Sequence, residues 1–139
     1  MADQEIQEKY ILYQLLTKNM ESLKEQFDVI QREFMEMRSA TDSIEEIKKL
    51  GSKNEVLIPL GGGCYGKGKI TENDSILVGI GSNLFLDEES SSAKKTITER
   101  GKELDKVSDE VKERMERVAT ELNKIGTQIQ ELSKKRGKA

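Results

Sequence analysis

Histidine is absent from this chain of 139 residues, and Cys64 is its only cysteine. A Ser-His-Asp triad, a zinc cluster and an intrachain disulfide are therefore excluded. The sequence predicts no catalytic residue, no metal ligand and no cofactor, so we expect a protein that is not an enzyme. We interpret Cys64 as an ordinary packing residue, because no histidine is present to activate its thiol.

Long hydrophobic runs are also absent. The longest uninterrupted apolar stretch covers residues 56–60, whereas a membrane-spanning helix needs roughly 18 residues or more. The chain does not open with the basic and apolar segments of a secretion signal. We expect a soluble protein of a reducing compartment, the cytoplasm.

The chain has no excess of positive charge. Its net charge is -3 and its isoelectric point is about 5.3, which argues against a nucleic-acid-binding surface. The exception is the C-terminal stretch KKRGKA, residues 134–139. It is interpreted either as a frayed helix end whose cations complement the helix dipole, or as a small docking tail.

Charged residues make up 35% of the chain and aromatic residues only 4%, a composition typical of long helices that bury one stripe. Residues 3–50 contain neither glycine nor proline and consist mainly of helix-forming residues. Apolar side chains recur every seven residues in two rows, which predicts a coiled-coil helix. The rows are Leu16, Leu23, Ile30, Met37 and Ile44, and Tyr13, Met20, Phe27 and Phe34.

Residues 90–135 predict a second helix of the same kind. Its main heptad row is Ile97, Leu104, Val111, Val118, Ile125 and Leu132, joined by Met115, Leu122 and Ile129. Residue numbers paired across the two helices sum to 141, as in Leu16 with Ile125 and Ile44 with Ile97. This constant sum predicts an antiparallel helical hairpin.

Residues 51–89 differ in character, because they hold the only proline and most of the glycines. Short β-type runs separated by GGG, TEND and GSN predict four strands over residues 55–60, 65–70, 75–80 and 84–87. The predicted fold class is α+β: a long antiparallel two-helix coiled coil with two central β-hairpins. We expect one domain over residues 1–139, with segments 1–50, 51–89 and 90–139.

The stretch EVLIPLGGGCYGKGKI, residues 55–70, matches two nucleotide-binding fingerprints. The position after Lys67 is glycine rather than the Ser or Thr that holds magnesium, and no helix follows to receive a phosphate. We therefore interpret the glycines as a tight hairpin turn. The short strands leave open edges, and Pro59 fits a strand edge or end, so the hairpins predict an oligomerisation platform.

The N-terminal helix carries YILYQLL at residues 10–16, apolar at six of seven positions. One partner helix cannot cover a helix that is apolar all round. Part of this stretch should therefore stay exposed as an interaction surface, unless it frays or packs on a sister subunit.

The order of long helix, two β-hairpins and long helix resembles the α-class subunit of prefoldin. The matching motifs are VLIPLGGG at residues 56–63 and VGIGSN at residues 78–83. Gly66 and Gly68 depart from the family, which more often has packing side chains there. So does Asn83, which stands where glycine is common.

This resemblance implies a hexamer of two α and four β subunits whose hairpins assemble into a platform. It also implies ATP-independent capture of unfolded proteins at the coil tips and their delivery to a group II chaperonin. The residues expected at the client site are Tyr10, Ile11, Leu15, Ile129 and Leu132. Those expected to hold the platform are Leu57, Ile58, Leu60, Val78, Ile80 and Leu84.

Two other interpretations belong to different classes. In the first, the chain is a structural assembly or filament subunit whose coils act as spacers. In the second, it is an NTPase that uses Lys67, against which the missing Ser or Thr is the main argument.

Overall fold

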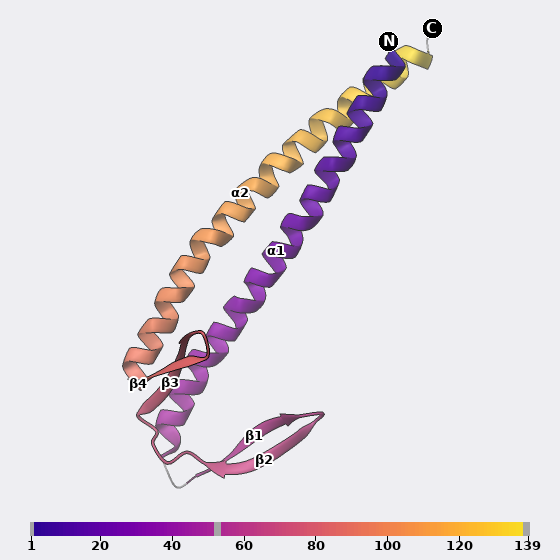
Figure 1. Cartoon of the computed structure of the whole chain (residues 1–139). Helices are drawn as coiled ribbons and strands as arrows, with labels where there is room; N and C mark the ends of the chain where they lie inside the picture. Colours follow the sequence, from indigo (N-terminus) through magenta and orange to yellow (C-terminus); the bar gives the residue numbers. More distant parts are fainter. Residues whose placement is uncertain (1, 52–53, 138–139) are drawn as a thin grey trace. The chain divides into compact units, whose positions relative to one another are not determined.

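The computed structural model describes residues 2–51 and 54–137 (Figure 1). The elements follow the order α1 (Ala2–Leu50), β1 (Glu55–Gly61), β2 (Cys64–Lys69), β3 (Ser75–Gly81), β4 (Leu84–Glu89) and α2 (Ser90–Gly137). The predicted α+β arrangement of two long helices and two hairpins is confirmed, and every strand starts within one residue of its predicted position. Neither helix contains a described stretch apolar enough to cross a lipid bilayer.

The ends of α1 follow from local chemistry. Acidic residues occupy its first turn and Lys48 and Lys49 its last, which complements the helix dipole. Gly51 then takes a φ of 70°, a left-handed conformation that commonly ends helices. Asn54 caps the terminus by donating its side-chain amide to the Leu50 carbonyl.

The basic C-terminal stretch is helical as far as it is described, because α2 continues through Gly137. Its cations occupy the last turn of the helix, where they complement the dipole. Arg136 also forms an ion pair with Asp3, Nε to Oδ1 at 3.0 Å. Residues 138 and 139 of the stretch lie outside the described residues, so its interpretation as a docking tail stays a prediction.

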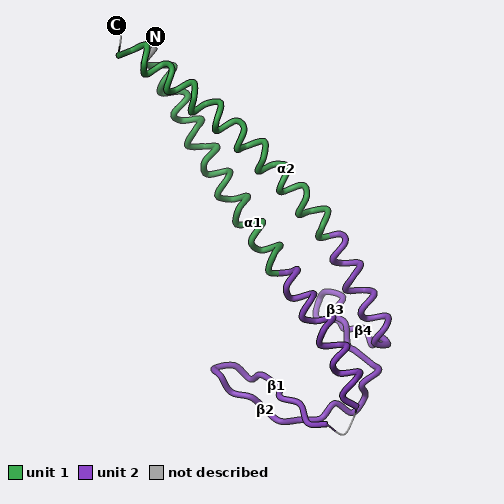
Figure 2. The backbone as a smooth tube through the Cα atoms, turned by 180° about the vertical axis from the view of Figure 1, so that it is seen from behind, with its two compact units in different colours: residues 1–32, 104–139 green, residues 33–103 purple. Residues whose placement is uncertain are grey.

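The chain divides into two compact units, residues 1–32 with 104–139 and residues 33–103, which Figure 2 colours separately. Over its described residues, 2–32 and 104–137, the first unit contains only helix. Its buried side chains come mainly from the predicted heptad rows, and they are Ile6, Leu23, Ile30, Ser108, Val111, Val118, Ile125 and Ile129.

Contacts within this first unit confirm that the two helices run antiparallel. Lys9 Nζ donates to Gln128 Oε1 at 2.6 Å, and Lys112 lies 5.7 Å from the centroid of the Phe27 ring. These pairs sum to 137 and 139 rather than the predicted 141. The contacts of Tyr13 with Gly126 and of Met37 with Gly101 have sums of 139 and 138, so these helix contacts lie two to four residues from the predicted register.

The second unit holds the two hairpins together with the adjoining parts of both helices. Its buried core is small and consists of Ile44 from α1, Val78 from β3 and Ala93 from α2, with Ile76 and Ile97 packed against it. β3 and β4 are thereby attached to the helices through one apolar face.

Asn73 and Ser90 organise the connection between the strands and the helices in this unit. The Ser90 amide donates to Asp74 O at 2.8 Å, and Ser90 Oγ donates to Asn73 O at 3.2 Å. Asn73 Nδ2 in turn donates to Lys48 O at 3.4 Å, near the end of α1. The segment between β2 and β3 therefore bonds both to the last turn of α1 and to the first turn of α2.

Candidate interaction surfaces

The apolar stretch near the start of α1 is exposed, as its pattern predicted. Tyr10 is 52% exposed, and Ile11 and Leu15 are each 59% exposed. Leu12 and Tyr13 are exposed as well. We call these five residues the α1 patch.

α2 covers only one side of this stretch. An ideal Cβ placed on Gly126 would lie 3.8 Å from Tyr13 Cε2, an ordinary contact distance, so the Tyr13 ring lies beside α2. Ile129 is only 8% exposed and Leu132 is half-buried. These two residues pack along the helix pair, whereas Tyr10, Ile11 and Leu15 face outward.

The second surface is the hairpin formed by β1 and β2. The two strands pair antiparallel from Glu55–Lys69 to Gly61–Cys64, with a register shift between Pro59 and Gly61. Gly61, Gly62 and Gly63 all have positive φ, which confirms the tight turn. Lys67 lies inside β2, so the phosphate-loop arrangement of glycine loop followed by helix is not present in this part of the described chain.

One face of this hairpin carries uncovered apolar side chains. Ile58 is 48% exposed and Leu60 is 69% exposed. They lie across the two glycines of β2, because an ideal Cβ would meet Ile58 Cδ1 at 3.0 Å from Gly68 and Leu60 Cδ1 at 3.8 Å from Gly66. Ile58 and Leu60 thus lie over Gly68 and Gly66, the two glycines that depart from the family pattern. Leu57, on the other face, is also exposed.

The hairpin of β3 and β4 repeats the first hairpin with an offset of 20 residues. Its register shift falls between Gly79 and Gly81, the counterparts of Pro59 and Gly61. Its turn residues Ser82 and Asn83 also have positive φ, 51° and 59°. The repeat was not predicted from the sequence, although the equal spacing of the two strand pairs could have revealed it.

The six residues expected to hold a platform fall into two groups. Leu57, Ile58, Leu60, Ile80 and Leu84 are exposed on the hairpins, whereas Val78 is only 5% exposed. Val78 therefore packs inside its own chain and has a structural position. Exposed apolar residues that the pattern did not single out are Leu77 and Phe85, whose counterparts are Leu57 and Tyr65.

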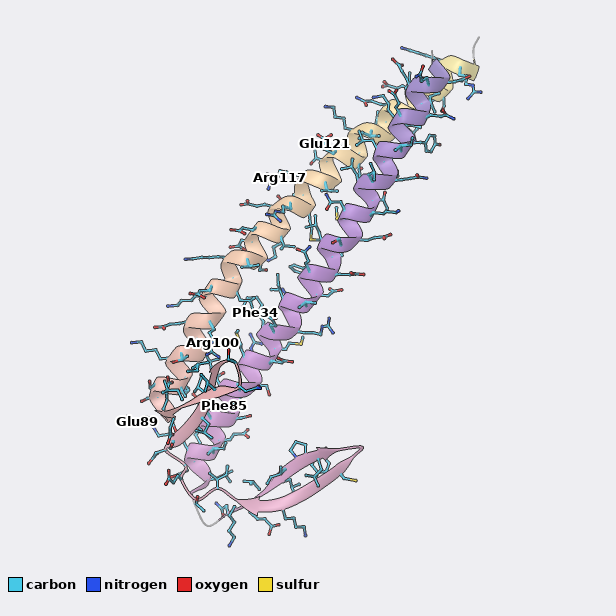
Figure 3. The ribbon with its side chains drawn as sticks, in the orientation of Figure 1. Phe34, Phe85, Glu89, Arg100, Arg117 and Glu121 are labelled. Carbon is cyan, nitrogen blue, oxygen red and sulfur yellow. The ribbon has the colours of Figure 1, made fainter. Side chains whose placement is uncertain are left out.

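β3 lies beside its own helices. Leu77, Val78 and Gly79 form part of one wall of a groove of about 610 Å³ whose other wall is α1. Arg100 of α2, labelled with Phe85 in Figure 3, donates from its guanidinium to Gly79 O at 2.7 Å. The Phe85 ring packs over Gly79, 3.5 Å from where a Cβ would stand.

An ion pair joins the helices in the same unit. Lys94 Nζ bonds Glu45 Oε1. The hydrogen bond from Lys94, and then its positive charge, lower the pKa of the Glu45 carboxyl below its ordinary value of 4.5. Among the residues that the structure describes, no group of three or more Cys, Asp or Glu side chains is arranged to hold a metal ion.

Comparison with known proteins gives a consistent result. The profile of the family described as "Prefoldin subunit" matches residues 16–135. Two proteins named "Prefoldin subunit alpha" are 26% identical over 93% of this chain and 88% of their own (Methanococcus aeolicus), and 30% identical over 66% and 67% (Methanococcoides burtonii).

The fold also has a solved counterpart. A chain from the cryo-EM structure of "filamentous PFD from Methanocaldococcus jannaschii" superposes with a TM-score of 0.73 at 18% identity, over 83% of this chain and 95% of that one. This likeness shows the fold. The family profile and the sequence matches show that the chain belongs to the prefoldin family of chaperone subunits, and to its α class.

Proposed function

We propose that this chain is the α-type subunit of an ATP-independent holdase, which captures unfolded proteins on the α1 patch and transfers them to a group II chaperonin. The observation that carries the proposal is the exposure of Tyr10, Ile11 and Leu15 on consecutive turns of one helix. Unfolded chains expose apolar side chains without a fixed sequence, and an apolar patch binds them by burying that surface.

The contribution of each client-site residue follows from its burial. Tyr10, Ile11 and Leu15 contact the client directly. Ile129 and Leu132 support them from α2, since Ile129 is buried and Leu132 is half-buried. Weak binding at one patch is sufficient if several subunits present their patches together, because avidity multiplies the individual affinities.

The hairpins supply the assembly that avidity requires. We propose that they join this chain to β-type subunits, two α with four β, through Leu57, Ile58, Leu60, Ile80 and Leu84, with Val78 anchoring the second hairpin. The open edges of two-stranded sheets favour pairing with another chain. The free thiol of exposed Cys64 fits a cytoplasmic location.

The experiment is light scattering of a chemically denatured client diluted without ATP into the assembled complex. The test variant carries Ile11→Ser and Leu15→Ser. The control carries Val29→Ser and Met35→Ser, two exposed apolar residues of α1 outside the patch. We expect the control complex to suppress scattering as the wild type does, and the test complex to lose most of that suppression while keeping its size. Full suppression by the test complex would refute the client site.

A second candidate function is that of a filament subunit without client binding. It is favoured by the similar solved structure, which is a filamentous assembly, and by the uncovered hairpins. Electron microscopy of the chain alone and with β-type subunits separates the two. Long polymers of the chain alone that leave client aggregation unchanged support the filament, and closed complexes with β-type subunits that suppress aggregation support the holdase.

A further inference from the structure

A stripe of exposed side chains crosses the α1 patch and carries a charge at each end. The four exposed residues of this stripe are Glu8, Ile11, Leu15 and Lys18. Their spacings of three, four and three residues place them on one side of the helix. We call these four residues the α1 stripe. It is acidic at its N-terminal end, apolar in the middle and basic at its C-terminal end.

Neighbouring charges are engaged within the chain, whereas those of the α1 stripe are not. Asp3 forms the ion pair with α2 described above, and Lys9 Nζ donates to Gln128 of α2. Among the residues that the structure describes, neither Glu8 nor Lys18 takes part in an ion pair within the chain. Both charges are therefore free to meet a partner.

The α1 stripe is complementary to itself when it is reversed. The numbers of Glu8 and Lys18 sum to 26, and so do those of Ile11 and Leu15. Two copies of α1 laid antiparallel in this register place each acid opposite a base and each apolar residue opposite another. A parallel pair would instead place Glu8 opposite Glu8 and Lys18 opposite Lys18, and like charges at close range repel each other.

We propose that the α1 stripe is a docking surface for the same stripe of a second copy of this chain, in an antiparallel pair with its twofold axis at Tyr13. Both copies use the same surface, so the contact closes as a dimer and does not continue into a polymer. The stripe is about 15 Å long at ~1.5 Å per residue. Four side chains per copy bury far less than the roughly 1,200 Å² of a stable interface, so the pair is weak and reversible.

This pairing rests on the α1 patch of the proposed function and adds a competitor for it. The pair covers Ile11 and Leu15, so a client must displace the second copy before it binds them. Because a weak pair exchanges rapidly, it shields the apolar patch while clients are scarce. It yields to a client that binds several patches of an assembly at once, since avidity favours that client.

The test is disulfide trapping of the full-length chain, with Cys64→Ser in every variant. Gln14 is exposed and lies next to the twofold axis, so chains with Gln14→Cys should cross-link to each other under mild oxidation. Glu25→Cys is the control, because this exposed position of α1 lies about 36 Å from its copy in the proposed pair. Assembly through another part of the chain would not favour Gln14 over Glu25.

Charge changes added to Gln14→Cys test the register. Glu8→Lys and Lys18→Glu each leave only like charges opposite one another, and each should lower the yield of cross-linked dimer by about fivefold or more. A chain with both changes regains opposite charges, as does an equimolar mixture of the two single variants, so both should recover the yield. Lys24→Glu and Asp28→Lys make the same changes of charge on exposed residues outside the stripe and should leave the yield unchanged.

Three results would overturn the pairing: equal cross-linking of Gln14→Cys and Glu25→Cys, single charge variants that cross-link as their parent does, or a chain with both changes that does not recover. The recovery keeps the test valid if a single change destabilised α1, because the chain with both changes contains each of them.

Client light scattering separates this pairing from the proposed function. If trapping gives the expected yields while Ile11→Ser with Leu15→Ser leaves suppression intact, the pair stands and the client site falls. If trapping fails while that variant loses suppression, the client site stands and the pair falls.

Discussion

The two hairpins of this chain have the same strand lengths, the same register shift and the same kind of turn. Their apolar faces differ in burial. Val78 of the second hairpin is buried against Ile44 and Ala93, whereas its counterpart Ile58 in the first hairpin is 48% exposed. One repeat is therefore covered by its own helices, and the other keeps its apolar face exposed. The comparison teaches that burial here depends on what lies next to a strand, since both strands carry equivalent apolar faces.

The largest effect that tests this comparison is an aspartate at the two equivalent positions. Val78→Asp places an unpaired carboxylate in the small core and should lower the free energy of unfolding by about 3 kcal/mol or more. Ile58→Asp lies on an uncovered face and should change it by at most about 0.5 kcal/mol. Chemical denaturation followed by circular dichroism measures both.

Assembly should show the reverse order. A chain with Ile58→Asp remains folded but should lose its association with other subunits, as measured by sedimentation. Equal destabilisation of the isolated chain by the two substitutions would mean that the first hairpin is packed as well as the second, and the contrast would disappear.

An intermediate effect concerns the two turns. Ser82 holds a φ of 51° where the first hairpin has Gly62 at 60°. A non-glycine residue in the left-handed region costs roughly 1–2 kcal/mol, part of which the greater freedom of unfolded glycine offsets. Ser82→Gly should therefore stabilise the chain by roughly 0.5 kcal/mol, and Gly62→Ser should weaken the first hairpin.

Thermal unfolding monitors Ser82→Gly, and amide exchange in β1 and β2 monitors Gly62→Ser. Loss of stability on Ser82→Gly would show that the serine side chain supports this turn in a way that a left-handed backbone alone does not explain.

The smallest effect concerns the ion pair beside the covered hairpin. The pKa of Glu45 is lowered by the hydrogen bond from Lys94 and then by its charge. Its stabilising contribution is therefore complete above the ordinary value of 4.5 and is lost as the pH falls through the lower folded value. Because both side chains are solvent-accessible, the effect is small.

Glu45→Gln should be slightly less stable than the wild type at neutral pH, and the two should converge in acid. Melting temperatures across that pH range give the difference. A gap between the two proteins that stays constant at every pH would assign the effect of the substitution to packing rather than to charge.

Much of the candidate site could be predicted from the sequence, because the exposure of a helix residue follows from the periodicity of the apolar residues. The heptad rows put Leu23 and Val118 inside, and the all-round apolar stretch required Tyr10, Ile11 and Leu15 to remain outside, where the structure places them. Ile129 was expected at the client site with them. Ile129 is buried, because it belongs to the row that packs along α1, and its part in the client site stays a prediction.

Burial in the hairpins was harder to predict from the sequence. An alternating strand pattern defines two faces but does not show which face is covered. Val78 and Ile58 were assigned the same role on the same kind of evidence. The hydrogen bond from Arg100 to Gly79 joins residues 21 apart in the sequence, and the one from Thr96 to Glu88 joins a helix to a strand eight residues earlier. No heptad or strand pattern predicts either contact.

The sequence by itself determined the elements of this protein: the absence of glycine and proline makes α1, the seven-residue spacing makes the coiled coil, and the glycine-rich turns make the hairpins. Tertiary structure alone decided which apolar face is covered. The helices and hairpins can each form from local preferences, but a face is buried only where another element approaches it. Ile44 and Ala93 approach Val78, and no described element of this chain covers Ile58 in that way.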